Sequence, residues 1–185
     1  MQVVVSHPTG NRNVRAIIAG MFQAQMLAEF NTTLATNPGS SFLKVLPASL
    51  QKELLRRTFS LPMYKVCSHP WRELARMALP KIGLKRFAEH EHKFASIDAV
   101  YKKLDQATSR RLRQISSKEN VSAVYAYEDG ALATFTKAKE LGLKCIYDLP
   151  IAFWETGRRL MSEEAERLPN WACTLGGGKI GRAHV

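Results

Sequence analysis

The N-terminal part of the chain combines a buried strand, a polar turn and a buried helix in immediate succession. Met1–Val5 is continuous and rich in β-branched residues, as in a strand covered on both faces. The polar turn HPTGNRN follows, and from Val14 to Phe30 apolar residues recur at spacings of three and four without proline, which predicts a helix packed on a sheet. FNTTLATN, from Phe30 to Asn37, then predicts a second strand that ends at a breaker. These elements form a βαβ unit, which should be parallel and right-handed.

The same alternation returns after Val121. VSAVYAY and LKCIYDLP predict two further strands, the helix between them ends at Gly142, and a last helix is expected from Ile151 to Leu168, before Pro169. The centre of the chain is expected to be mostly helical, with helices over 48–57, 69–79 and 96–116 and a short extended piece at YKVCS. The sequence therefore predicts one α/β domain, a Rossmann-like parallel sheet with helices on both faces.

Composition limits the class of protein. The 185 residues, 45% of them hydrophobic, are enough to bury one core. Cys67, Cys145 and Cys173 have no CxxC or Cys/His ligand spacing, and His90 and His92 face different directions, so we expect no disulfide framework and no metal site. No apolar run approaches the roughly 20 residues of a membrane span, and no signal peptide is recognisable. We expect a cytoplasmic protein, or one peripheral at the inner face of the membrane.

The positive charge is concentrated in the middle of the chain. Residues 44–118 contain 17 Lys and Arg against six Asp and Glu, and this difference accounts for the whole net charge of +11. Nucleic acid, anionic lipid headgroups and sugar nucleotides are all chemically suitable counterparts, and a solvated basic surface is the simpler interpretation. No recognition-helix, RRM or KH signature is present, so we do not expect a nucleic-acid partner.

Three polar loops follow predicted strands, and ligands of open α/β sheets bind outside the carboxyl ends of the strands. In the first loop, Gly10 permits a tight turn, Asn11 or Asn13 can cap the next helix, and Arg12 adds charge for an anion at the helix N-terminus. The loop has neither the GxGxxG nor the GxxxxGK[ST] pattern. A plain helix cap, with His7 bonded to nearby backbone, explains it equally well.

The other two loops carry carboxylates. Glu128 and Asp129 follow the third predicted strand, directly before a helix, where a carboxylate is favoured even if it only caps the helix. Asp148 follows the next strand, where it can bind a hydroxyl-rich ligand or form a structural Asx-turn. Three polar strand ends on one side of a sheet favour a binding site.

Several segments resemble the N-terminal half of bacterial group 1 (family 4-like) glycosyltransferases of the two-domain GT-B fold. They occur in order over nearly the whole chain, down to Leu175: VSHPTGNRNVRA, AEFNTT, HPWRELARM, SIDAVYKKLD, VYAYEDGALATFTKAKELGLKCIYDLPIAFW and EEAERLPNWACTL. The resemblance implies a Rossmann-like acceptor domain followed by a C-terminal domain that binds a nucleotide-sugar donor. It also implies transfer of the sugar with retention of configuration, usually without a metal or other cofactor.

The resemblance also implies roles for the three loops. Gly10, Asn11, Arg12 and Asn13 would lie nearest the donor phosphates, in place of the Gly-Gly loop of many relatives. Tyr127, Glu128 and Asp129 would hold the acceptor, whose identity the sequence does not give. Asp148 would be the catalytic residue, because Tyr147-Asp148 stands where relatives often have His-Asp. The basic middle third is similar to surfaces with which such enzymes contact anionic membranes. The alternative is a basic nucleic-acid-binding or peripheral membrane-binding module without catalysis.

The C-terminal end departs from this pattern. The last seven residues, KIGRAHV, can be back-translated as AAG ATC GGA AGA GCA CAC GTC, which resembles a sequencing-library adapter. We therefore expect a Rossmann-like domain over 1–175, incomplete at its C-terminal end, and a non-native tail over 176–185. A natural disordered tail is the alternative. With the donor domain missing, the fragment should bind weakly and catalyse no transfer.

Overall fold

The computed structural model describes residues 1–88, 93–149 and 153–174. The chain divides into two compact units, Met1–Tyr147 and Asp148–Val185. His90, His92 and the expected tail over 176–185 lie outside the described residues.

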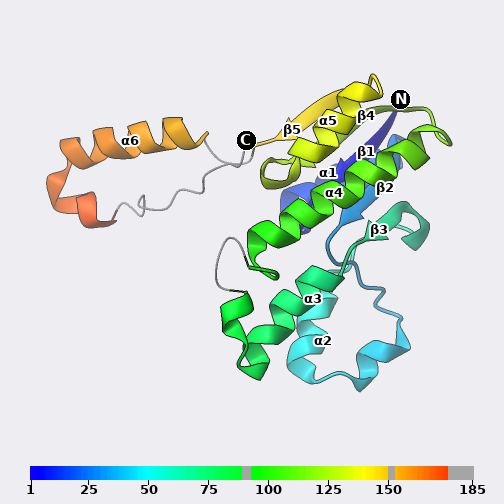
Figure 1. Cartoon of the computed structure of the whole chain (residues 1–185), viewed down its shortest axis with the longest axis horizontal. Coiled ribbons are helices and arrows are strands. Elements are labelled where there is room, and N and C mark those ends of the chain that lie inside the picture. The colour runs from blue at the N-terminus through cyan, green and yellow to red at the C-terminus, as the bar shows by residue number, and fades with distance from the viewer. Residues whose placement is uncertain (89–92, 150–152, 175–185) are drawn as a thin grey trace. The chain divides into compact units, whose positions relative to one another are not determined.

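The first unit is built on a parallel sheet (Figure 1). Its five strands have the spatial order β3-β2-β1-β4-β5, and β1 pairs in parallel with β2 and β4 while β2 pairs in parallel with β3. The strands are β1 (Gln2–Ser6), β2 (Leu27–Thr32), β3 (Val66–Ser68), β4 (Val121–Tyr127) and β5 (Lys144–Asp148). This arrangement confirms the predicted α/β, Rossmann-like sheet.

Helices connect the strands. The α-helices are α1 (Arg12–Gln23), α2 (Ala48–Leu55), α3 (Trp71–Ala78), α4 (Ile97–Ser116), α5 (Leu132–Glu140) and, in the second unit, α6 (Trp154–Arg167). The short 3₁₀ helices are η1 (Ser41–Val45), η2 (Met63–Lys65), η3 (Leu79–Ile82), η4 (Lys85–Phe87), η5 (Glu128–Gly130) and η6 (Pro169–Thr174). Figure 1 shows α2 and α3 beyond the end of the sheet where β2 ends. No helix in the described ranges is long and apolar enough to cross a membrane.

The central strands of the sheet are buried on both faces, as predicted. Val3 and Val5 pack with Val14 and Ile18 of α1 in one core cluster. A second cluster on the other face contains residues of α4 and α5, with Val4 and its neighbours from the sheet: Val4, Ala28, Leu112, Ile115, Val124 and Ala138. Val4 lies on the other face of the sheet from Val3 and Val5, because successive side chains of a strand point to opposite faces.

The first helix is shorter than predicted, and the second strand begins earlier. α1 ends at Gln23, Gln25 has a left-handed φ of 54°, and β2 starts at Leu27 rather than at Phe30. All six residues of β2 are buried, so this strand lacks the alternation that would distinguish it from a helix in the sequence. The predicted ends of other elements lie closer to the observed ends. Ser96 caps α4, and Gly142 follows α5 with a φ of 71°.

Candidate functional site at the carboxyl edge of the sheet

The loop between β1 and α1 is ordered by its own polar side chains. Asn11 is the N-cap of α1, and its Oδ1 accepts a hydrogen bond from the Val14 amide at 2.8 Å. The Nδ1 atom of His7 accepts one from the Thr9 amide at 3.1 Å. The structural interpretation of Asn11 as a helix cap and of His7 as bonded to nearby backbone is therefore confirmed.

Gly10 is required for a different reason than the predicted tight turn. Its φ is not in the left-handed region, but a Cβ at this position would overlap the ring of Phe59. The Phe59 ring itself packs edge-on against Phe30, with ring centroids 4.9 Å apart. The absence of a side chain at Gly10 therefore lets the loop approach the segment that follows α2.

Arg15 ties this loop to that segment. Its Nε donates to the Gly10 carbonyl at 2.8 Å, and its Nη2 donates to the Arg56 carbonyl at 2.7 Å. Its Nη1 donates to the Thr58 carbonyl, and the guanidinium lies 4.7 Å from the centroid of the Phe59 ring. One arginine thus fixes the spacing between two segments that are far apart in the sequence.

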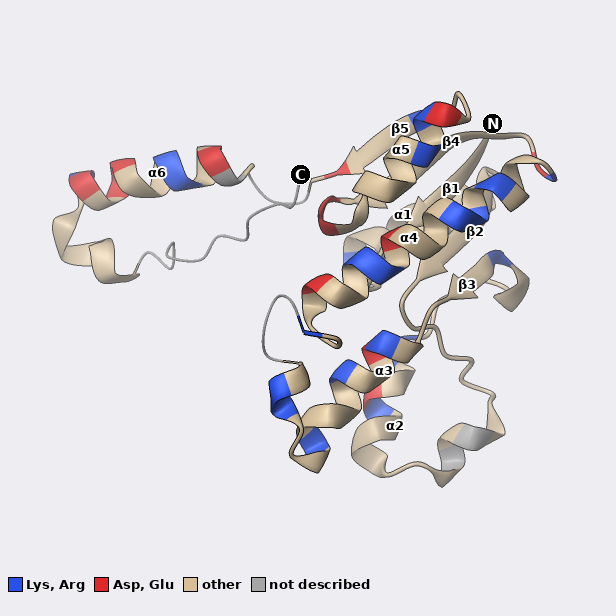
Figure 2. Cartoon of the chain, in the orientation of Figure 1, with Lys and Arg blue, Asp and Glu red and all other residues tan. Residues whose placement is uncertain are grey.

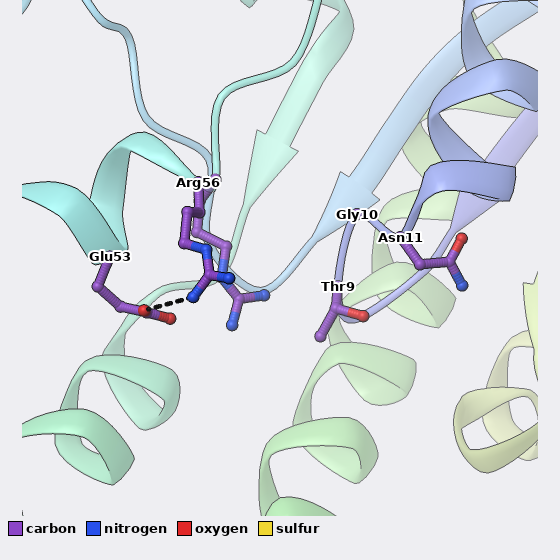
Figure 3. Close-up of a pocket in the computed structure, with 6 residues that line it drawn as sticks. Thr9, Gly10, Asn11, Glu53 and Arg56 are labelled. Carbon is purple, nitrogen blue, oxygen red and sulfur yellow. Dashed lines mark ion pairs between the residues drawn. The ribbon is translucent and has the colours of Figure 1, made fainter.

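A pocket of about 300 Å³ opens between the two segments (Figure 3). Its lining residues come from the β1–α1 loop, from α2 and from the two residues that follow α2: Thr9, Gly10, Asn11, Glu53, Arg56 and Arg57. Arg56 is largely exposed and pairs with Glu53 at 3.6 Å, whereas the side chain of Arg57 is only 13% exposed. The pocket therefore brings together the N-cap residue of α1, two guanidinium groups and one carboxylate, and this net positive charge suits an anion.

A buried carboxylate holds Arg57. The side chain of Glu73, on α3, is 3% exposed and accepts a hydrogen bond from Nη2 of Arg57 at 3.1 Å. Arg76 binds the same carboxylate through Nε and Nη2, both at 2.8 Å. This contact raises the pKa of the Arg76 guanidinium, chiefly through the hydrogen bond to Glu73.

The predicted phosphate-binding residues divide into two groups. Gly10 and Asn11 line the pocket. Arg12 and Asn13 are the first two residues of α1, both exposed, and neither is a lining residue. Their roles stay predictions.

The predicted acceptor loop lies beside the first loop. The rings of His7 and Tyr127 have centroids 4.6 Å apart, and those of Tyr101 and Tyr127 are 6.0 Å apart. Burial, followed by the charge of Asp129, raises the pKa of the Tyr101 phenol. Burial also raises the pKa of Tyr147, with Glu128 and Asp129 acting in the same direction. The end of β4 is therefore an acidic cluster bordered by aromatic rings.

Another residue caps the helix that follows this loop. The amides of Ala133 and Thr134, in the first turn of α5, donate to Oδ2 and Oδ1 of Asp105 at 2.7 and 2.8 Å. Asp105 lies on α4 and is buried. The carboxylate that serves these two amides is thus Asp105.

Asp148 is the last residue of β5, is partly buried and begins the second compact unit. The site described above is confined to the first unit, so the catalytic role expected of Asp148 stays a prediction. Among the described residues, no three His, Cys, Asp or Glu side chains are grouped as a metal ion would require.

Sequence reasoning missed the residues outside the three loops that line the pocket or contact the residues of its wall. These are Arg15, Glu53, Arg56, Arg57, Glu73, Arg76 and, beside the acceptor loop, Tyr101. The adjacent pair Arg56-Arg57 at the end of a predicted helix and the i,i+3 spacing of Glu73 and Arg76 were the available signals.

Comparison of the chain with protein-family models, with curated proteins and with solved structures finds no match.

Proposed function

We propose that the chain is the acceptor-side domain of a glycosyltransferase that uses a nucleotide-sugar donor, and that the pocket beside Gly10 receives the donor's diphosphate. The observation that carries the proposal is the position of this pocket: it lies at the carboxyl end of β1, beside the N-terminus of α1, with Arg56 and Arg57 in its wall. Diphosphates bind at this place in open α/β sheets because helix amides and arginine forks match their oxygens.

The arginines would act on the leaving group. In the proposed transfer, an acceptor hydroxyl oxygen bonds to the anomeric carbon, and the bond from that carbon to the diphosphate breaks. The hydroxyl proton is taken up by a diphosphate oxygen. Negative charge grows on the diphosphate during this step, so Arg57 and the α1 amides would stabilise the transition state more than the ground state.

The acidic cluster would receive the acceptor. Tyr127, Glu128 and Asp129 follow β4, next to the loop that lines the pocket. Carboxylates beside aromatic rings suit a hydroxyl-rich ligand, since the carboxylates accept hydrogen bonds from hydroxyl groups. In this proposal Asp148 positions the acceptor or the transferred sugar, and its substitution by Asn reduces turnover in a chain extended through a donor domain.

Ligand titration of the 185-residue chain tests the phosphate part of the proposal. UDP, GDP and inorganic pyrophosphate should bind, while uridine and guanosine should not, because the pocket contributes charge rather than base recognition. Arg57→Met should weaken binding of all three anions by about tenfold, the effect of one lost charge-assisted contact. Arg110→Met removes an exposed arginine of α4 outside the pocket and is the matched control. Equal affinity for UDP and uridine would exclude a phosphate site.

A second function, binding to an anionic surface without catalysis, is favoured by the segment 79–88. Ile82 is 67% exposed and Phe87 38%, and three exposed basic residues lie among them: Lys81, Lys85 and Arg86. In Figure 2 the ribbon of this segment is coloured blue at its Lys and Arg positions. Cosedimentation with phosphatidylglycerol vesicles, abolished by Ile82→Ser and Phe87→Ser, would support this function. Binding to duplex DNA in place of vesicles would assign the segment to nucleic acid.

A further inference from the structure

Two arginines share one buried carboxylate behind the pocket wall. Of these two, Arg57 lines the pocket and Arg76 is not a lining residue. Both contact Glu73, whose side chain is 3% exposed. A buried carboxylate requires a compensating charge, and one arginine would be enough to neutralise it.

The hydrogen bonds are divided unequally between the two arginines. Arg76 donates two hydrogen bonds to the Glu73 carboxylate, both at 2.8 Å. Arg57 donates one hydrogen bond from Nη2, at the longer distance of 3.1 Å. The bidentate pair, which is the stronger arrangement, is therefore formed by the arginine outside the pocket. Glu73 and Arg76 neutralise each other, and the three-residue cluster retains one positive charge on the pocket side.

The other charged side chains that line the pocket do not supply this excess. Arg56 is paired with Glu53, and its side chain is 74% exposed, so solvent screens its charge. Arg57 is 13% exposed, and a charge in such a position acts on a nearby anion through a lower effective dielectric constant. The attraction of the pocket for an anion thus depends on the balance within the cluster.

We propose that Arg76 is a positioning residue for phosphate binding: it neutralises Glu73, so that the charge of Arg57 is directed to an anion in the pocket. This inference rests on the proposed function, since it names the residue that gives the same pocket its affinity for phosphate. Without Arg76, Arg57 and Glu73 would form a neutral pair, and the anion would lose its main electrostatic partner.

The test is the dissociation constant of inorganic pyrophosphate, measured by calorimetry on the whole 185-residue chain. Arg76→Met should weaken binding by about tenfold, although Arg76 does not line the pocket. The double variant E73Q/R76M removes both the carboxylate and its partner, so it restores the positive charge of Arg57 and should return the affinity to within about threefold of the original. Arg76→Lys keeps the charge and should retain most of the affinity.

Arg111→Met is the matched control, because Arg111 also forms a bidentate pair with a largely buried glutamate, Glu29, and neither residue lines the pocket. This variant should leave pyrophosphate binding unchanged. Thermal unfolding of each variant separates loss of the fold from loss of charge. Rescue by E73Q/R76M is the decisive readout, since a purely structural role of Arg76 would leave the double variant as weak as R76M.

The outcomes distinguish this inference from the proposed function. If Arg57→Met weakens pyrophosphate binding and Arg76→Met does not, the charge-balancing role is wrong and the phosphate pocket stands. If E73Q/R76M stays as weak as R76M, the role is again wrong. If Arg57→Met itself has no effect, the pocket does not bind phosphate and both fail.

Discussion

The imidazole of His7 and the phenol ring of Tyr127 lie with their centroids 4.6 Å apart, at an interplanar angle of 59°. His7 directly follows β1 and Tyr127 ends β4, two strands that pair side by side in the sheet. This ring contact joins the loop that lines the proposed phosphate pocket to the loop that carries Glu128 and Asp129. The proposed donor and acceptor sides therefore share one edge of the sheet, as a transfer between two ligands requires.

Gly10→Ala should destabilise the protein by about 1–3 kcal/mol, because the new methyl group would overlap the Phe59 ring, which is already packed against Phe30. Denaturant unfolding measures the change. Gly20→Ala is the matched control: its Cβ meets no atom within 4 Å, and it lies inside α1, where alanine is favoured over glycine by about 0.5–1 kcal/mol. A Gly10→Ala protein as stable as the original would show that Phe59 can move aside without cost.

Arg57 and Arg12 should differ in their effect on diphosphate binding. Arg57 lines the pocket and is mostly buried, whereas Arg12 is exposed on the first turn of α1 and is not a lining residue. Arg57→Met should weaken UDP binding by about tenfold, and Arg12→Ala by less than about threefold, because solvent screens an exposed charge. The dissociation constant of UDP for each of the two variants, measured at low and at high salt, tests this difference. If Arg12→Ala weakened UDP binding more than Arg57→Met, Arg12 would be the main phosphate contact.

His69 should make the stability of the fold depend on pH. Burial, followed by the charge of Arg111, lowers the pKa of its imidazole below the ordinary 6.5. The unfolded chain therefore binds a proton at a higher pH than the folded chain does. The free energy of unfolding falls as the pH drops from about 6.5 through the folded-state pKa, and it is fully retained above 6.5. His69→Gln should flatten this part of the curve between pH 7.5 and 5, as measured by urea unfolding. An unchanged curve would assign the dependence to another group.

Most strands and helices are predictable from the sequence, whereas the pocket is not. Polar loops after apolar strands, the Ser96 cap and the glycine after α5 are local signals, so β1, β4 and α4 were placed close to their observed bounds. The pocket depends on contacts such as that from Arg15 to the Arg56 carbonyl, 41 residues further along the chain, which no local pattern contains. The α1–β2 boundary was misplaced for a related reason: the register that buries β2 is set by its neighbours in the sheet.

Substitutions of Asp105 and Glu128 should distinguish a helix-capping role from a binding role at the end of β4. Asp105 is buried and accepts hydrogen bonds from the amides of Ala133 and Thr134, so Asp105→Ala should cost about 1–3 kcal/mol of stability by leaving these donors unpaired. Glu128→Gln keeps the shape of the side chain and leaves the contacts of Asp105 to α5 in place, so it should cost less stability than Asp105→Ala. Thermal unfolding of both variants measures the contrast. In a chain extended through a donor domain, Glu128→Gln should raise the KM for the acceptor. A Glu128→Gln protein as destabilised as Asp105→Ala would instead make Glu128 a structural part of the helix start.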